Sequence, residues 1–373
     1  MSHLPEAKPF QKAHTYCTYC PKLCRFACPV STVEARETTT PWGKMSSLHH
    51  VAEGNLPLSE EQTELWYDCT GCMRCRTFCD HRNEVAAALG AGRVAALRSE
   101  TAPPAAYEIV ERHAERQEAA AASGREIFSR EERERRSEVV FVPGCTACAV
   151  APESARASFE ALENLLERSV RVEIDQCCGL PLLDAGDAEG FLSAARRLQQ
   201  ALGDAREIVF ADPGCLHALQ VSGPRLGLEP RSGMRHLAVI ASERLDRLEP
   251  IPFEGDVRYH DSCKLGRGLG VYEEPRAVLR KILGRAPLEL PMNRERAECS
   301  GAGGGLPRTH PATSAEIAEE RLEEHARAGG GVLVTACPGS AHRLRSSERG
   351  EVLSFGELLA RASRPDGGPG PRS

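Results

Sequence analysis

The stretch EVVFVPGC, residues 138–145, predicts a short buried strand that ends at a cysteine. From Pro152 the chain continues with a helical segment, a second strand before QCCGLP at 176–181, another helix, and a third strand in EIVFADPGC at 207–215. Short apolar runs that alternate with helical segments are typical of βαβ units with a parallel sheet. This part of the chain is therefore predicted to be α/β.

The same order of segments returns further along the chain, which indicates an internal duplication. DVRYHDSC at 256–263, ECSGAGGG at 298–305 and GVLVTACPGS at 331–340 repeat the series. We expect two duplicated βαβ-type subdomains, at 138–250 and 251–363, with cysteines at the C-terminal ends of parallel strands, where open α/β sheets hold their ligands. Equivalent cysteines are separated by a near-constant interval: Cys145 and Cys263, Cys177 and Cys299, Cys215 and Cys337.

Eight more cysteines lie before residue 80, in YCTYCPKLCRFACP at 16–29 and CTGCMRCRTFC at 69–79. Three closely spaced cysteines with a fourth farther on are typical of [4Fe–4S] ligation, and in two-cluster ferredoxins the fourth cysteine of each run binds the other cluster. The pattern predicts a first cluster on Cys17, Cys20, Cys24 and Cys79, and a second cluster on Cys69, Cys72, Cys75 and Cys28.

The N-terminal region, residues 1–100, is predicted to be a helical ferredoxin-like domain, because helix-compatible sequence near Pro57–Trp66 separates the two runs. Two details depart from the usual pattern: three residues separate Cys20 from Cys24, and Asp80 follows the last cysteine in place of proline. Neither change removes a ligand. The alternative is a pair of zinc sites, although zinc motifs usually present cysteines as separated CxxC pairs.

Composition narrows the class of protein. The formal charge of −6 argues against a nucleic-acid partner, and no stretch approaches the length of an apolar membrane span. The first fifteen residues contain no apolar signal-peptide core, so the 16 cysteines are expected in a reducing compartment, where clustered thiols are metal ligands or redox groups. We expect a cytoplasmic chain, with peripheral attachment at the inner face of the membrane left open.

Two further segments lie outside these domains. Residues 101–137 are predicted to be a charged helical linker, since they are rich in arginine and glutamate. The tail RPDGGPGPRS, residues 364–373, has the proline and glycine content of a disordered end.

The motifs GC…CCG…GC and HDSC…CSG.GG…C resemble the paired CCG domains of the heterodisulfide-reductase family. That family includes the iron–sulfur subunits of anaerobic glycerol-3-phosphate dehydrogenase, glycolate oxidase and lactate-utilisation systems. A ferredoxin-type domain followed by two CCG repeats is similar to this chain over about residues 14–345. The resemblance implies a role in passing electrons between a flavin or carrier subunit and a quinone or disulfide.

In that family a full repeat reads C…CCG…CxxC and holds an iron–sulfur cluster, and this chain departs from the pattern. Ala218 stands where the last cysteine of repeat one is expected, and Ser300 and Ser340 replace two cysteines of repeat two. The alternative for each repeat is a scaffold of buried free thiols. The candidate ligands of a third cluster are Cys145, Cys177, Cys178 and Cys215, with Cys148 and His217 as outside candidates, and a weaker site comprises Cys263, Cys299 and Cys337.

We expect an iron–sulfur electron-transfer subunit of an oxidoreductase complex, working between a flavoprotein donor and a quinone- or disulfide-side acceptor, with a membrane quinone-reactive subunit as a further candidate partner. The alternatives are a catalytic disulfide or quinone reductase centred on repeat one and a zinc-stabilised scaffold. GAGGGL at 301–306 lacks the third glycine of a dinucleotide loop, so close backbone packing near a cysteine is expected there. His260 is interpreted as a structural residue or a hydrogen-bond donor to a cluster sulfur.

Overall fold

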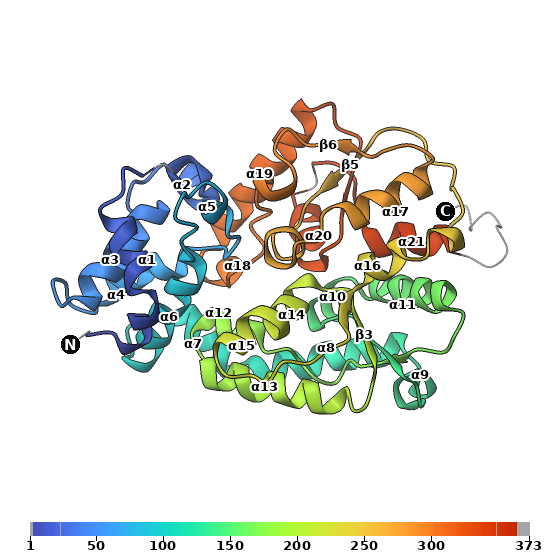
Figure 1. The fold of residues 1–373 in the computed structure, drawn as a ribbon, viewed down its shortest axis with the longest axis horizontal. Coiled ribbons are helices and arrows are strands. Elements are labelled where there is room, and N and C mark those ends of the chain that lie inside the picture. The colour runs from blue at the N-terminus through green and yellow to red at the C-terminus, as the bar shows by residue number, and fades with distance from the viewer. Residues whose placement is uncertain (1–2, 23, 348, 364–373) are drawn as a thin grey trace. The chain divides into compact units, whose positions relative to one another are not determined.

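The computed structural model describes residues 3–22, 24–347 and 349–363. The chain divides into two units, each built from several segments (Figure 1). The tail predicted at 364–373 lies outside the described residues. Unit 1 comprises residues 1–113, 180–191 and 295–321, and unit 2 comprises residues 114–179, 192–294 and 322–373.

Unit 1 is helical around a core that includes Trp66, Tyr67 and Leu89, as predicted for the N-terminal region. The segment near Pro57–Trp66 contains α4, which contributes the buried side chains of Trp66 and Tyr67 to this core. Its helices are α1 (Gln11–Thr18), α2 (Pro29–Glu34), α3 (Pro41–Ala52), α4 (Glu60–Tyr67), α5 (Arg74–Thr77), α6 (Val85–Arg98), α7 (Pro104–Glu111), α12 (Leu180–Ala185) and α18 (Leu306–Thr309).

Helix α3 has a sharply defined start that matters for the site below. Pro41 occupies the first turn, where its missing N–H costs nothing, and the Thr40 side chain accepts a hydrogen bond from Gly43 N. Almost every residue of α3 is buried, including Lys44. The position of each side chain along this helix is therefore set by packing on all sides.

Unit 2 contains two four-stranded parallel sheets with the same topology, in the orders β2-β1-β3-β4 and β6-β5-β7-β8. This arrangement confirms the predicted fold class, a helical domain with two duplicated α/β subdomains. The strands are β1 (Val139–Val142), β2 (Arg171–Val172), β3 (Glu207–Phe210), β4 (Met234–His236), β5 (Val257–His260), β6 (Leu288–Glu289), β7 (Val332–Thr335) and β8 (Val352–Ser354).

Helices surround both sheets, and the segment predicted as a charged helical linker is helical in α7, α8 and α9. The remaining helices are α8 (His113–Ile127), α9 (Arg130–Glu134), α10 (Cys145–Val150), α11 (Pro152–Leu166), α13 (Ala188–Ala201), α14 (Pro213–His217), α15 (Gly223–Arg225), α16 (Leu237–Ser242), α17 (Glu273–Leu283), α19 (Pro311–Arg327), α20 (Pro338–Arg345) and α21 (Phe355–Ala362).

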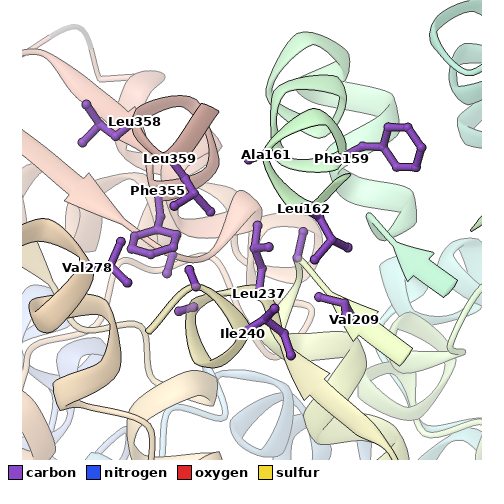
Figure 2. Packing of buried hydrophobic residues seen from close by; sticks show 14 of the residues in the cluster. Phe159, Ala161, Leu162, Val209, Leu237, Ile240, Val278, Phe355, Leu358 and Leu359 are labelled. Carbon is purple, nitrogen blue, oxygen red and sulfur yellow. The ribbon is translucent and has the colours of Figure 1, made fainter. Parts of the chain in front are cut away.

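The two repeats of unit 2 pack against each other through two pairs of helices. Helix α11 of repeat one packs on α21 of repeat two, and α16 of repeat one packs on α17 of repeat two. The result is one continuous hydrophobic core, in which burial of a side chain such as Phe355 contributes about 1.5–3 kcal/mol. Figure 2 shows part of this core, with Leu162, Leu237, Ile240, Val278 and Phe355 among its side chains.

Among the described helices, none has the length and apolar character needed to span a membrane.

Candidate metal centres

The eight N-terminal cysteines form two groups in unit 1, each taking three thiols from one run and one from the other. We name Cys17, Cys20, Cys24 and Cys79 set 1, and Cys28, Cys69, Cys72 and Cys75 set 2. The four thiol-bearing residues of set 2 line one small cavity, together with Lys44, Met73 and other residues. The structure thus brings Cys28 to the three cysteines of the second run, as the crosswise hypothesis requires.

Set 1 is gathered where α1 ends. Burial first, and then the thiols of Cys17, Cys79 and Cys20, raise the pKa of Cys24 to about 12. The pKa of Cys17 is raised to about 11, because burial outweighs a hydrogen bond from Asn83 Nδ2 to Cys17 Sγ, 3.2 Å long, that lowers it. Cys79 therefore lies with the cysteines of the first run.

The two sets adjoin one another. The pKa of Cys75 is well above its usual value because of burial first, and then because of the neighbouring thiols of Cys72, Cys69, Cys24 and Cys28. Cys24 belongs to set 1 and the other thiols to set 2. Groups bound to the two sets are therefore neighbours.

Raised pKa values have a chemical consequence for both sets. Without a metal the thiols of Cys17, Cys24, Cys69 and Cys75 are neutral at pH 7, whereas metal ligation requires thiolates. Binding of a positively charged iron core supplies the compensating charge and releases the thiol protons.

Set 2 has the geometry of a cluster site. Four thiols around a single small cavity fit a cubane core, which takes one thiolate at each of its four irons. Within the described ranges, no three His, Cys, Asp or Glu side chains are grouped so as to hold a single metal ion.

Repeat one of unit 2 brings its four predicted cysteines together; we name Cys145, Cys177, Cys178 and Cys215 set 3. Cys145 Sγ and Cys177 Sγ are 3.8 Å apart, and Cys178 exchanges hydrogen bonds with Cys177 and Cys215. Gly144 has φ of +90°, and a Cβ there would lie 3.5 Å from Cys215 Sγ, so glycine lets the chain pass close to the thiols.

The outside candidates of repeat one differ in their surroundings. Cys148 is buried, and burial together with the Cys145 thiol raises its pKa to about 12. His217 packs against Gly268, where an added Cβ would lie 2.5 Å from the imidazole ring, and its Nδ1 lies 3.5 Å from Ser222 Oγ. Cys148 thus lies near set 3, whereas His217 contacts Ser222 and the backbone of repeat two.

Repeat two places Cys263 near Cys337, because Cys263 contributes to raising the Cys337 pKa to about 12, after burial and Asp212. Ser340 N donates to Cys337 Sγ over 3.5 Å, so the serine that replaces cysteine caps the thiol. Cys299 belongs to a segment of unit 1. His260 is buried at the end of β5.

The glycines after Cys299 confirm the expected close packing. A Cβ at Gly304 would lie 2.1 Å from Cys69 O, and one at Gly303 would lie 2.6 Å from Thr70 O. The loop therefore rests on the backbone of set 2.

Three residues near the thiols were missed by the sequence analysis: Lys44, Asn83 and Asp212. The Asp212 carboxyl, whose pKa burial raises, in turn raises the pKa of Cys145, Cys215 and Cys337. Its place directly after a buried strand was an available signal. Lys44 lies within α3 and Asn83 in the loop before α6, and nothing in their spacing marks them.

Comparisons with known proteins agree with this geometry. The family model for the 4Fe-4S dicluster domain matches residues 13–83, and the model for the cysteine-rich CCG domain matches residues 139–220 and 257–345. The dicluster match shows that the chain carries two [4Fe–4S] clusters, and the CCG matches fit further iron–sulfur binding. The predicted domain bounds and the individual ligand assignments stay predictions.

Several curated proteins are similar in sequence. One subunit of the dihydromethanophenazine:CoB–CoM heterodisulfide reductase from Methanosarcina barkeri is 30% identical over 55% of this chain and 53% of its own length. One subunit of the fumarate reductase (CoM/CoB) from Methanothermobacter marburgensis is 25% identical over 80% of this chain and 62% of its own length. The uncharacterized protein YkgE from Escherichia coli is 30% identical over 50% of this chain and 80% of its own length.

The chain spans about half the length of the heterodisulfide reductase subunits that it matches. The family matches and the relatives together show that the protein belongs to the heterodisulfide-reductase-related iron–sulfur proteins that combine a 4Fe-4S dicluster domain with two cysteine-rich CCG domains.

Proposed function

We propose that this chain is an electron-transfer protein that relays single electrons between a flavoprotein dehydrogenase or similar donor and a quinone- or disulfide-side acceptor. The observation that carries the proposal is the adjacency of sets 1 and 2, with Cys24 of one set beside Cys75 of the other. A [4Fe–4S] cluster, when bound, takes up and releases one electron. The contribution of the chain is to hold the two clusters close together and to adjust their potentials through burial and hydrogen bonds to sulfur.

We assign the ligands of the two clusters crosswise, to sets 1 and 2 as defined above. The cavity of set 2 and the mutual effects of the set 1 thiols on their pKa values support this assignment. In the same way, the convergence of four thiols supports a third cluster on set 3. Set 4, which we define as Cys263, Cys299 and Cys337, remains the weakest of the four candidate sites.

The relatives support redox partners of the kind proposed. Two of them are named as subunits of a heterodisulfide reductase and a fumarate reductase. We propose a flavoprotein or other redox subunit as the direct partner, with a membrane quinone-reactive subunit as a second one. The proposed location is the cytoplasm, including peripheral attachment to the inner face of the membrane.

The decisive experiment measures iron and acid-labile sulfide per chain after anaerobic purification, with absorption and EPR spectra before and after reduction. About eight irons correspond to the N-terminal pair alone, and about twelve correspond to a loaded set 3 as well. Alanine replacement of Cys178 should lower the second value to the first. A colourless protein that holds zinc and no iron would contradict the proposal.

Electron transfer itself is tested by adding an oxidised dye and a reduced flavoprotein. The dye should be reduced rapidly only when both the chain and the flavoprotein are present, because a relay needs a donor to supply its electrons. Reduction of a disulfide by the chain with a reduced dye alone would instead favour a catalytic reductase centred on set 3.

A further inference from the structure

In each N-terminal cysteine set, a side-chain nitrogen contacts a cysteine sulfur, and the two nitrogens differ in charge. In set 1 the donor is the neutral amide of Asn83, whose Nδ2 lies 3.2 Å from Cys17 Sγ. In set 2 the donor is the ammonium of Lys44, whose Nζ lies 3.8 Å from Cys28 Sγ. The two contacts can therefore be compared within one unit, because they differ in the charge of the donor. A hydrogen bond from a charged donor is about twice as strong as one from a neutral donor.

Lys44 is held in an environment where its charge acts strongly. Its side chain is 1% exposed and lines the same cavity as the set 2 thiols. Water does not screen a charge at such a site, so its effect on neighbouring groups is much larger than at the surface.

A second buried cation reinforces Lys44. Arg93 is 4% exposed and donates a 3.0 Å hydrogen bond to Cys69 O, and its other hydrogen bonds go to the backbone carbonyls of Trp66, Asp184 and Gly304. Two buried cations therefore lie at set 2, Lys44 at a cysteine sulfur and Arg93 at a cysteine carbonyl oxygen.

We propose that Lys44 is a positioning residue that makes the set 2 cluster the stronger electron acceptor of the two, so that an electron shared between them rests on set 2. The inference depends on the proposed relay function. One electron leaves the set 1 cluster, which is oxidised, and reduces the set 2 cluster, with no proton and no bond exchanged. An added electron makes a cluster more negative, and a buried ammonium on one of its cysteine sulfurs stabilises that form.

The test is a redox titration of the whole chain followed by EPR, with iron measured for every variant. Wild-type protein should show two one-electron transitions from the N-terminal clusters. Lys44→Met should lower the midpoint potential of the upper transition by at least 59 mV, which is a factor of ten in the equilibrium constant of a one-electron couple. The midpoint potential of the lower transition should stay unchanged. Lys44→Gln should give a smaller shift, and Lys44→Arg should restore the wild-type value.

Asn83→Leu is the matched control, because it removes the equivalent contact in set 1. It should move the lower transition and leave the upper one unchanged. The inference is overturned if Lys44→Met shifts the potential of the lower transition, or if it shifts neither potential. If Lys44→Met loses iron, the other two variants decide: the inference is overturned if Lys44→Gln and Lys44→Arg have the same potential for the upper transition. Absence of two clusters in the wild type would contradict the relay function itself.

Discussion

Cys28 and Cys79 are the residues on which the arrangement of both clusters depends. Each is the last cysteine of its own run, and each lies beside the three thiols of the opposite run. Pro29 begins α2 directly after Cys28, so the chain turns away from the first run at that point. One thiol from each run is thus available to the other set.

Single replacements at these positions distinguish crosswise from local ligation. Cys28→Ala should remove the set 2 cluster, about four irons, and leave a transition that still responds to Asn83→Leu. Cys79→Ala is the counterpart and should leave only the transition that responds to Lys44→Met. EPR-monitored titration with iron analysis measures both. Local ligation predicts the reverse, with Cys28→Ala abolishing the transition that Asn83 affects.

His236, at the end of β4, gives unit 2 a pH dependence. Burial lowers its pKa to about 4, against hydrogen bonds from the ring to backbone carbonyls that raise it. Nε2 donates to Ala211 O over 3.0 Å, and Nδ1 accepts from Ala238 N over 3.1 Å, so the neutral ring satisfies both of its neighbours. A proton added to Nδ1 breaks the second bond.

We expect unit 2 to lose stability as the pH falls from 6.5 toward 4. In the unfolded chain the imidazole has its ordinary pKa near 6.5, so between pH 6.5 and 4 the unfolded state binds a proton that the folded state does not. The free energy of unfolding therefore falls with pH, by at most about 3 kcal/mol. Hydrogen exchange of the β3 and β4 amides, corrected for the intrinsic rate, measures the effect. His236→Gln should flatten the dependence, and an equally steep profile in that variant would assign the effect to other groups.

Among the elements, the glycine loop before α18 shows how a tight contact is built without a large side chain. Gly304 and Gly305 both have positive φ, +68° and +73°. They differ in their surroundings, because a Cβ at Gly304 would lie 2.1 Å from Cys69 O, whereas one at Gly305 would have its nearest neighbour, Asp184 Cβ, at 3.7 Å. Strain from φ is therefore common to both positions, and the steric clash is confined to one.

Gly304→Ala should destabilise unit 1 by about 3–5 kcal/mol, because the clash with the set 2 backbone adds to the cost of a left-handed alanine. Gly305→Ala should cost about 1–2 kcal/mol from the backbone conformation alone. Denaturant unfolding of the iron-loaded chain measures both values. Equal losses in the two variants would mean that the loop moves away from Cys69 at little cost.

At the scale of the whole molecule, the two units depend on different sources of stability. Unit 2 is held by parallel sheets and by the packing of α11 on α21 and α16 on α17 around one apolar core, with a buried contact between Ser154 Oγ and Ser354 Oγ beside it. The cysteine loops of unit 1 surround buried thiols whose pKa values are raised by burial and by one another. Iron is therefore expected to stabilise unit 1 more than the sheets of unit 2.

Iron removal under reducing conditions should consequently affect the units unequally. Amides of residues 17–28 and 69–79 should exchange much faster in the apoprotein, whereas those of β1 and β3 should keep most of their protection. Hydrogen exchange with mass spectrometry measures all four segments in one experiment. Restoring iron and sulfide should reverse the change, and a loss of protection in β1 comparable to that in the loops would contradict this division.

Much of the fold follows from local sequence patterns. Apolar strands that run into cysteines predicted both α/β repeats. Strands β4 and β8 were not predicted, because each has only three residues and a polar residue at its centre or end. Such short strands are recognisable only once a neighbouring strand supplies their hydrogen bonds.

Cysteine spacing by itself determined that this chain carries clustered thiols suited to iron–sulfur chemistry, since such ligands must recur within a few residues of one another. Tertiary structure alone decided which other groups meet those thiols. Lys44 reaches Cys28 and Asn83 reaches Cys17 through packing of separate segments, and the fold brings Asp212, whose place after a strand is visible in the sequence, to Cys145 as well. The electrostatic surroundings of a buried site depend on distance in space and on exclusion of water, and neither is written in the spacing of residues along a chain.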